Sequence, residues 1–239
     1  MLRFALLAVP LALGCPRQGA LPIVLPPPPE VRAAPAPPST EETALFDSIT
    51  VDYMRGDAVG ALEAIRAFEG RYPTSVALGM LADWKAGIEL VGRQPPSLAG
   101  LRFFDQAGAY ADNVVTLVAF FEPWCPHCQV ELPQLELARR DLEASGFGII
   151  GLTQLSRGST DADLAAFVET GFLRFPIAVE DGSLTQAFGV TGVPFLMLVR
   201  DGRVVWAGHP ELVTLDLIEG LVAGSPLPLP RGGTSSIPP

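Results

Sequence analysis

From residue 92 onward, short apolar runs alternate with segments in which apolar residues recur every three or four positions. The runs predict buried strands, the longer spacing predicts helices, and Asp201-Gly202 between two apolar segments predicts a tight hairpin. The expected strands cover 114–121, 147–152, 175–179, 195–199 and 204–207, with a short hairpin over 98–104, and the expected helices cover 131–144, 161–170 (capped by Asp161) and 212–222. This order predicts an α/β domain over residues 92–224, with a mixed central sheet flanked by helices.

Residues 41–91 show the helical spacing alone. A helical region interrupted at Gly56 is expected to end at Pro73, and a further helix is expected over 76–90. The positions of Gly56, Ala61 and Pro73 resemble one tetratricopeptide unit, a helical hairpin with small residues at the helix contact. Because repeat arrays need about three units to bury a continuous core, the pattern favours a small all-α segment packed on the next domain over a peptide-binding module.

The first 15 residues have the pattern of a secretory signal peptide: a basic start, an apolar stretch, and small residues before Cys15. Ala12-Leu13-Gly14-Cys15 resembles a bacterial lipobox, in which the cysteine becomes the lipidated N-terminus. The alternative is an ordinary signal peptide that contains a cysteine by chance. The apolar stretch is about half of the ~20 residues that a membrane-spanning helix needs. We therefore expect an exported protein that is lipid-anchored through Cys15.

Proline-rich segments lie on either side of the predicted helices and strands. Residues 16–40 hold nine of the 24 prolines and have no periodic apolar pattern, which predicts a semi-rigid, unfolded linker. Residues 225–239 hold five more prolines and predict a disordered tail.

The charge balance argues against nucleic acid as a partner. Asp and Glu number 26 against 16 Lys and Arg, so the formal net charge is −10, which repels phosphate backbones. The chain has three cysteines. If Cys15 is lipidated, Cys125 and Cys128 are the one pair left, and no cysteine remains for a structural disulfide.

The pair forms a Cys-x-x-Cys motif directly after a predicted buried strand. This places Cys125 at a helix N-terminus, where free amide N–H groups and the helix dipole stabilise a thiolate, so Cys125 is predicted to be the nucleophile. Cys128, one turn inside the helix and less exposed, is predicted to be the resolving thiol that releases the substrate. Half of a zinc site is the other interpretation. The sequence has no second cysteine pair and only one other histidine besides His127, His209, so four zinc ligands are hard to assemble and no metal is expected.

Four features over about residues 92–222 resemble the thioredoxin-fold TlpA/ResA-like thiol-disulfide oxidoreductases of bacteria. They are Trp124-Cys125-x-x-Cys128 after an aromatic strand, Glu131-Leu132-Pro133, an extra unit over 156–181 that contains Phe175-Pro176, and Gly192-Val193-Pro194.

The resemblance implies roles for several further residues. Pro194 is expected to be cis and to turn the Val193 backbone toward a substrate chain, so that recognition is by backbone pairing. Trp124 is expected to cover the dithiol. Glu131 is expected to assist proton transfer, because Ala119 stands where thioredoxins carry a buried Asp. No organic cofactor is implied beyond the redox-active disulfide.

The direction of electron flow is not decided by these motifs. Pro126-His127 between the cysteines is the dipeptide of the strongly oxidising DsbA family, in which the histidine and the helix N-terminus stabilise the thiolate. Val193 also resembles that family, whereas Glu131 and the tether resemble the reducing TlpA/ResA group. We predict that Pro126 and His127 tune Cys125 toward an easily ionised thiol and a comparatively oxidising potential.

The sequence therefore predicts a thiol-disulfide oxidoreductase that acts on substrate protein thiols or disulfides outside the cytoplasm, on a membrane facing the periplasm. A membrane or periplasmic redox partner is expected to reset the dithiol. One alternative is a copper-handling lipoprotein that binds the metal through the cysteine pair, with His127 or His209. Another is a peroxiredoxin-like peroxidase, but such enzymes need a Thr three residues before the cysteine, where this chain has Glu122.

Overall fold

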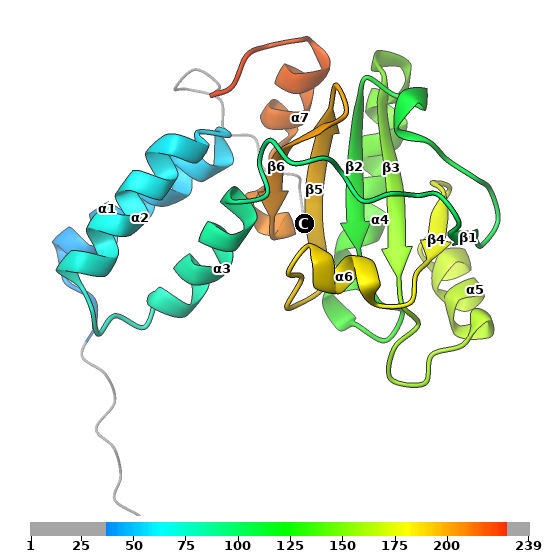
Figure 1. The fold of residues 1–239 in the computed structure, drawn as a ribbon, viewed down its shortest axis with the longest axis horizontal. Coiled ribbons are helices and arrows are strands. Elements are labelled where there is room, and N and C mark those ends of the chain that lie inside the picture. The colour runs from blue at the N-terminus through cyan, green and yellow to red at the C-terminus, as the bar shows by residue number, and fades with distance from the viewer. Residues whose placement is uncertain (1–36, 229–239) are drawn as a thin grey trace, which may run out of the picture. The chain divides into compact units, whose positions relative to one another are not determined.

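A six-stranded mixed sheet forms the centre of the computed structural model, which describes residues 37–228 (Figure 1). Its order is β1-β4-β3-β2-β5-β6. The strands are β1 (Arg102–Phe103), β2 (Val115–Phe120), β3 (Phe147–Thr153), β4 (Ile177–Val179), β5 (Phe195–Arg200) and β6 (Arg203–Gly208). β2 pairs parallel with β3 and antiparallel with β5, and every residue of β2 is buried. The predicted fold class is confirmed.

The two faces of the sheet are covered by different elements, because successive side chains of a strand point to opposite faces. Val115, Leu117 and Ala119 of β2 belong to one buried cluster, and Val118 and Phe120 belong to another. The first cluster includes residues of α4 (Pro126–Leu142), α5 (Asp161–Thr170) and α7 (Leu215–Val222). The second is covered by α6 (Ser183–Ala187), which the sequence did not predict, and by the segment before β2.

The predicted hairpin over residues 98–104 is wrong. β1 is two residues long and pairs antiparallel with β4, through Arg102 with Val179 and Phe103 with Ala178. Leu98, Leu101 and Phe103 pack against the second buried cluster. The alternating apolar residues that suggested a hairpin therefore cover one face of the sheet instead.

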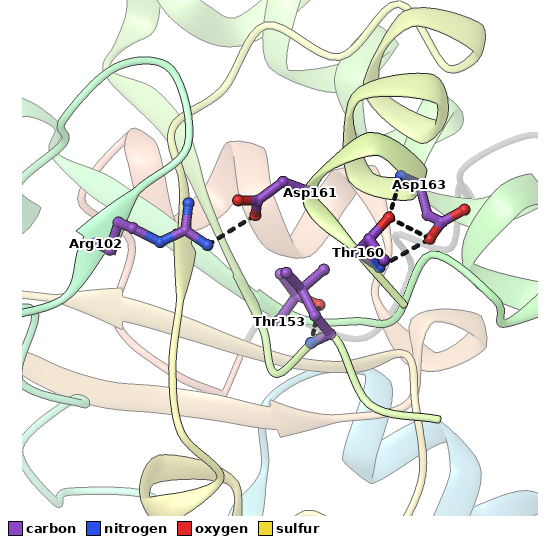
Figure 2. A network of polar contacts seen from close by, with 6 residues as sticks. Arg102, Thr153, Thr160, Asp161 and Asp163 are labelled. Atoms are coloured by element: carbon purple, nitrogen blue, oxygen red, sulfur yellow. Dashed lines mark hydrogen bonds and ion pairs between the residues drawn. The ribbon is translucent and has the colours of Figure 1, made fainter. Parts of the chain in front are cut away.

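Two predicted helix starts and one predicted helix cap differ from the structure. α4 begins at Pro126 rather than at 131, and α7 begins at Leu215, after a 3-10 turn over Pro210–Leu212. The cap of α5 is Thr160, not Asp161: the Thr160 side chain accepts from the Asp163 N–H, and the Asp163 carboxylate accepts from the Thr160 N–H (Figure 2). Asp161 lies in the first turn and forms an ion pair with Arg102 at 2.7 Å (Figure 2).

The N-terminal helices α1 (Thr40–Met54), α2 (Ala58–Arg71) and α3 (Leu78–Ile88) share the first buried cluster with the sheet. Tyr53 links them to β6: its hydroxyl donates to the Ala207 carbonyl, and Trp206 Nε1 donates to the Tyr53 carbonyl at 3.2 Å. The Tyr53 ring also stacks on Trp84, with centroids 5.4 Å apart. The helices and the strand therefore bury apolar surface against one another, which stabilises both.

Gly87 of α3 lies directly against β6. A Cβ built there would lie 2.6 Å from the Ala207 carbonyl oxygen and 2.6 Å from the Tyr53 hydroxyl. We expect Gly87→Ala to lower the free energy of unfolding by about 1–3 kcal/mol, because the overlap outweighs the better helix propensity of alanine. Gly79→Ala is the matched control, since that glycine lies in the same helix with nothing within 4 Å. Denaturant unfolding measures both, and equal stability of Gly87→Ala and the wild type would contradict this packing.

Several predictions concern residues outside the described part of the chain. They are the signal peptide, the lipidation of Cys15, the linker up to residue 36 and the tail from residue 229. Within residues 37–228, no helix has the length and apolar character needed to cross a bilayer.

Candidate redox site

Cys125 lies at the point where the central strand passes into a helix. β2 ends at Phe120, and Cys125 is the N-cap of α4, with an extended backbone and Pro126 as the first helical residue. Proline suits this position because its missing N–H would have no partner in the helix anyway. The Cys125 sulfur is thus held at the positive end of a 17-residue helix, as the motif predicted.

The loop before β5 brings a backbone carbonyl to the Cys125 sulfur. Cys125 Sγ donates to the Val193 carbonyl oxygen at 3.3 Å, although the two residues are 68 positions apart. The Val193–Pro194 peptide bond is cis, and Pro194 is buried at the start of β5. Because β5 is the direct neighbour of β2, the two loops meet at the same end of the sheet. The structure therefore brings together Cys125, Val193 and Pro194.

Cys128 lies beneath this surface, one helical turn into α4. Its side chain has no exposed area, whereas Cys125 is 5% exposed, and both are free thiols. Burial raises the pKa of the Cys128 thiol well above its ordinary range, and the neighbouring Cys125 side chain adds to this. Cys128 thus retains its proton at neutral pH.

Glu122 was not among the predicted site residues, yet its carboxylate is buried there, with 4% of the residue exposed. Its two oxygens accept hydrogen bonds from the backbone N–H groups of Gln154, at 3.1 Å, and Ser156, at 2.9 Å. Its charge contributes to the raised pKa of Cys128. The available signal was an acidic residue directly after the predicted strand over 114–121 and three positions before the first cysteine. Ala119, at the position expected for a buried acid, is fully buried in β2.

Trp124 lies against the loop that Glu122 holds. Its indole N–H donates to Ser156 Oγ at 3.1 Å, and the Arg157 guanidinium carbon lies 3.7 Å from the centroid of its ring. The loop after β3 therefore contacts the redox motif at two places, through the Glu122 carboxylate and through the Trp124 ring.

The other predicted site residues lie around the dithiol without fixed partners. Pro126 and His127 are exposed in the first turn of α4. Glu131 is half-buried one turn beyond Cys128, and its side chain forms no hydrogen bond or ion pair with residues 37–228. No group of three or more His, Cys, Asp or Glu side chains within those residues is arranged to hold a metal ion.

These features define a thioredoxin-like domain with a Cys-x-x-Cys dithiol at a helix N-terminus. Residues 106–207 match the model of the AhpC/TSA family. The thiol-disulfide oxidoreductase ResA of Bacillus cereus is 30% identical over 88 residues, which are 36% of this chain and 49% of ResA. The thioredoxin-like protein YneN of Bacillus subtilis is 22% identical over 98 residues, 41% of this chain and 57% of YneN.

Among solved structures, the thioredoxin domain of a thiol-disulfide oxidoreductase from Bacteroides vulgatus is similar, with a TM-score of 0.47 and 20% identity. The similarity covers 57% of this chain and 98% of that one. The chain spans about half the length of the ResA and YneN relatives that it matches. The resemblance of the redox domain to ResA, predicted from the motifs, is confirmed.

Proposed function

We propose that the protein is a thiol-disulfide oxidoreductase that acts on protein thiols and disulfides outside the cytoplasm, with Cys125 as nucleophile and Cys128 as resolving thiol. The observation that carries the proposal is the placement of the Cys125 sulfur at the start of α4, against the Val193 carbonyl, with a buried thiol one turn behind it. A thiolate at that position is reactive, and a substrate chain can pair with the backbone beside it.

In the reducing direction, the Cys125 thiolate attacks one sulfur of a substrate disulfide. The new bond is a mixed disulfide, and the other substrate sulfur leaves as a thiolate that takes up a proton. Cys128 then loses its proton and attacks the Cys125 sulfur, which forms the Cys125–Cys128 disulfide and releases the second substrate thiolate. Two electrons pass from the protein to the substrate. The oxidising direction reverses these steps, starting with a substrate thiolate that attacks Cys125.

The surrounding residues support these steps in different ways. Glu131 is the base that we propose for the Cys128 proton, because it lies one turn away without a partner of its own. Val193, Pro194 and Trp124 position the substrate chain, and the exposed His127 tunes the dithiol together with the helix N-terminus. The dithiol needs no organic cofactor, and a second redox protein restores its starting state. A lipid on Cys15 would keep the protein on its membrane.

The test is to measure disulfide exchange of the full chain with insulin, and the potential of its dithiol in glutathione or dithiothreitol buffers. We expect reversible two-electron exchange that is confined to Cys125 and Cys128. A reduction potential of about −120 mV would identify an oxidant or isomerase tuned by His127. A reduction potential of about −270 mV would identify a reductase that needs an electron donor. Stoichiometric tight copper(I) binding with negligible exchange would contradict the proposal and favour a metallochaperone. Rapid peroxide reduction without disulfide exchange would favour a peroxidase.

A further inference from the structure

A groove runs between α4 and α5 beside the redox motif. Its volume is about 560 Å³. Trp124, Gln129 and Pro133 line it on the side of α4, and Phe167 and Gly171 line it on the side of α5. It is large enough for one or two side chains of a bound polypeptide, and it adjoins Cys125 through Trp124.

Arg157 places an unpaired positive charge at this groove. The residue is exposed, its guanidinium carbon lies over the Trp124 ring, and it forms no ion pair within residues 37–228. The other charged residue of the groove, Asp163, is engaged by the Thr160 side chain and backbone N–H (Figure 2). Contact with an aromatic ring restricts the position of a guanidinium group while its N–H groups can still bind a carboxylate.

The loop that carries Arg157 is held in place. Three of the residues between β3 and α5 have left-handed backbone angles: φ is 54° at Leu155, 56° at Arg157 and 82° at Gly158. Such angles cost free energy in residues other than glycine, so the surroundings must enforce them. The buried Glu122 carboxylate holds the loop in this conformation, because it accepts hydrogen bonds from two backbone N–H groups at the start of the loop. Arg157 is thus held at a defined position relative to Cys125.

Exposed apolar side chains lie close in the chain to residues that line this groove. Phe172, next to the lining residue Gly171, is 74% exposed and has a φ of 52°, which is unusual for a bulky residue. Val130 and Leu137 are exposed and lie three residues before and four residues after Pro133, on the same face of α4. A strained, exposed aromatic side chain next to a groove of mixed polar and apolar lining indicates a binding surface.

We propose that this groove binds the polypeptide substrate next to its reacting cysteine, with Arg157 recognising an acidic side chain and Phe172 an apolar one. The inference rests on the proposed function, because the groove selects among substrates of the dithiol. A protein with a net charge of −10 otherwise repels acidic chains, so a fixed cation beside the nucleophile determines which acidic segments reach it.

The test uses peptides with one cysteine, linked through a disulfide to thionitrobenzoate. The Cys125 thiolate of the reduced protein attacks the peptide sulfur and expels the coloured thionitrobenzoate thiolate. Cys128 then displaces the peptide thiolate, so that the protein is oxidised by two electrons and the probe is reduced to two thiols. One set of peptides carries Glu or Lys two, three or four residues from the cysteine, on either side. A second set carries Leu or Ser at these positions, to compare an apolar side chain with a polar one.

At the best position, we expect the wild type to react about three- to tenfold faster with the Glu peptide than with the Lys peptide. Arg157→Gln should bring this ratio to within about twofold of one, and added salt should reduce it in the wild type. Phe172→Ser should lower the Leu-to-Ser ratio but preserve the Glu-to-Lys ratio. Each ratio is taken within one variant, so a uniform loss of activity cancels.

Arg140→Gln is the control, because Arg140 is exposed and about 20 Å along α4 from Cys125. It should retain the wild-type ratios. Equal rates for Glu and Lys peptides at every position, or an unchanged preference in Arg157→Gln, would overturn the groove proposal alone. Failure of the wild type to release thionitrobenzoate from any peptide faster than Cys125→Ser would instead refute the proposed function.

Discussion

Replacing Cys125 by serine is expected to abolish disulfide exchange, with the rate falling by at least about a thousandfold to the uncatalysed level. A serine hydroxyl is not ionised at neutral pH and cannot form a disulfide, whereas the fold should tolerate the nearly isosteric change. The Val193 carbonyl oxygen accepts a hydrogen bond from the Cys125 thiol at 3.3 Å, and it can accept one from a serine hydroxyl in the same way. Insulin reduction and peptide oxidation measure the activity, and circular dichroism checks the fold.

The control for this variant is Ser156→Ala, which removes only the hydrogen bond from Trp124 and retains both sulfurs. We expect it to retain exchange within about tenfold of the wild type. Substantial exchange by Cys125→Ser would mean that the more deeply buried Cys128 is the nucleophile, contrary to the proposed mechanism.

Replacing Cys128 by serine is expected to stop turnover at the mixed disulfide. Cys125 can still attack a substrate, but no second thiol is in position to release it. The variant should therefore accumulate a covalent complex with substrate proteins while its steady-state rate falls at least about a hundredfold. Non-reducing electrophoresis and mass spectrometry detect this complex. Its absence, with turnover retained, would show that Cys128 does not resolve the intermediate.

The two thiols are also expected to differ in their reaction with iodoacetamide. Burial raises the pKa of Cys128 far above its ordinary value, so little thiolate exists at neutral pH and its amount continues to increase past pH 9. In Cys125→Ser, alkylation of Cys128 should be at least about a hundredfold slower at pH 7 than alkylation of Cys125 in Cys128→Ser. It should accelerate with pH without a plateau below pH 9. Comparable rates would contradict the burial of Cys128.

The pattern of apolar positions predicted the elements that carry their own local signal. β2 and β3 are apolar except for one threonine each, and each is buried along its whole length. α6 was missed because it is five residues long and has no buried residue. The apolar pattern by itself placed the start of α4 at 131, because the first turn begins with Pro126 and carries no apolar period, whereas the Cys-x-x-Cys motif placed the helix start at Cys125.

Some residues of the candidate site could likewise be predicted from the local sequence, and others could not. The role of Cys125 follows from a local motif after a strand, because the strand and the helix that it begins are both encoded nearby. The position of Glu122 does not follow from a local motif, because its carboxylate accepts hydrogen bonds from backbone N–H groups 32 and 34 residues further along the chain. Such partners meet only when β2 and β3 pair.

The sequence by itself determined a dithiol at a helix N-terminus, within an α/β domain of thioredoxin type. Tertiary structure alone decided which groups surround that dithiol. The Val193 carbonyl reaches Cys125 because β5 lies beside β2, and Arg157 reaches Trp124 because the buried carboxylate of Glu122 holds the intervening loop. These contacts depend on the register of paired strands and on the hydrogen bonds of a buried charge, and neither exists before the chain has folded.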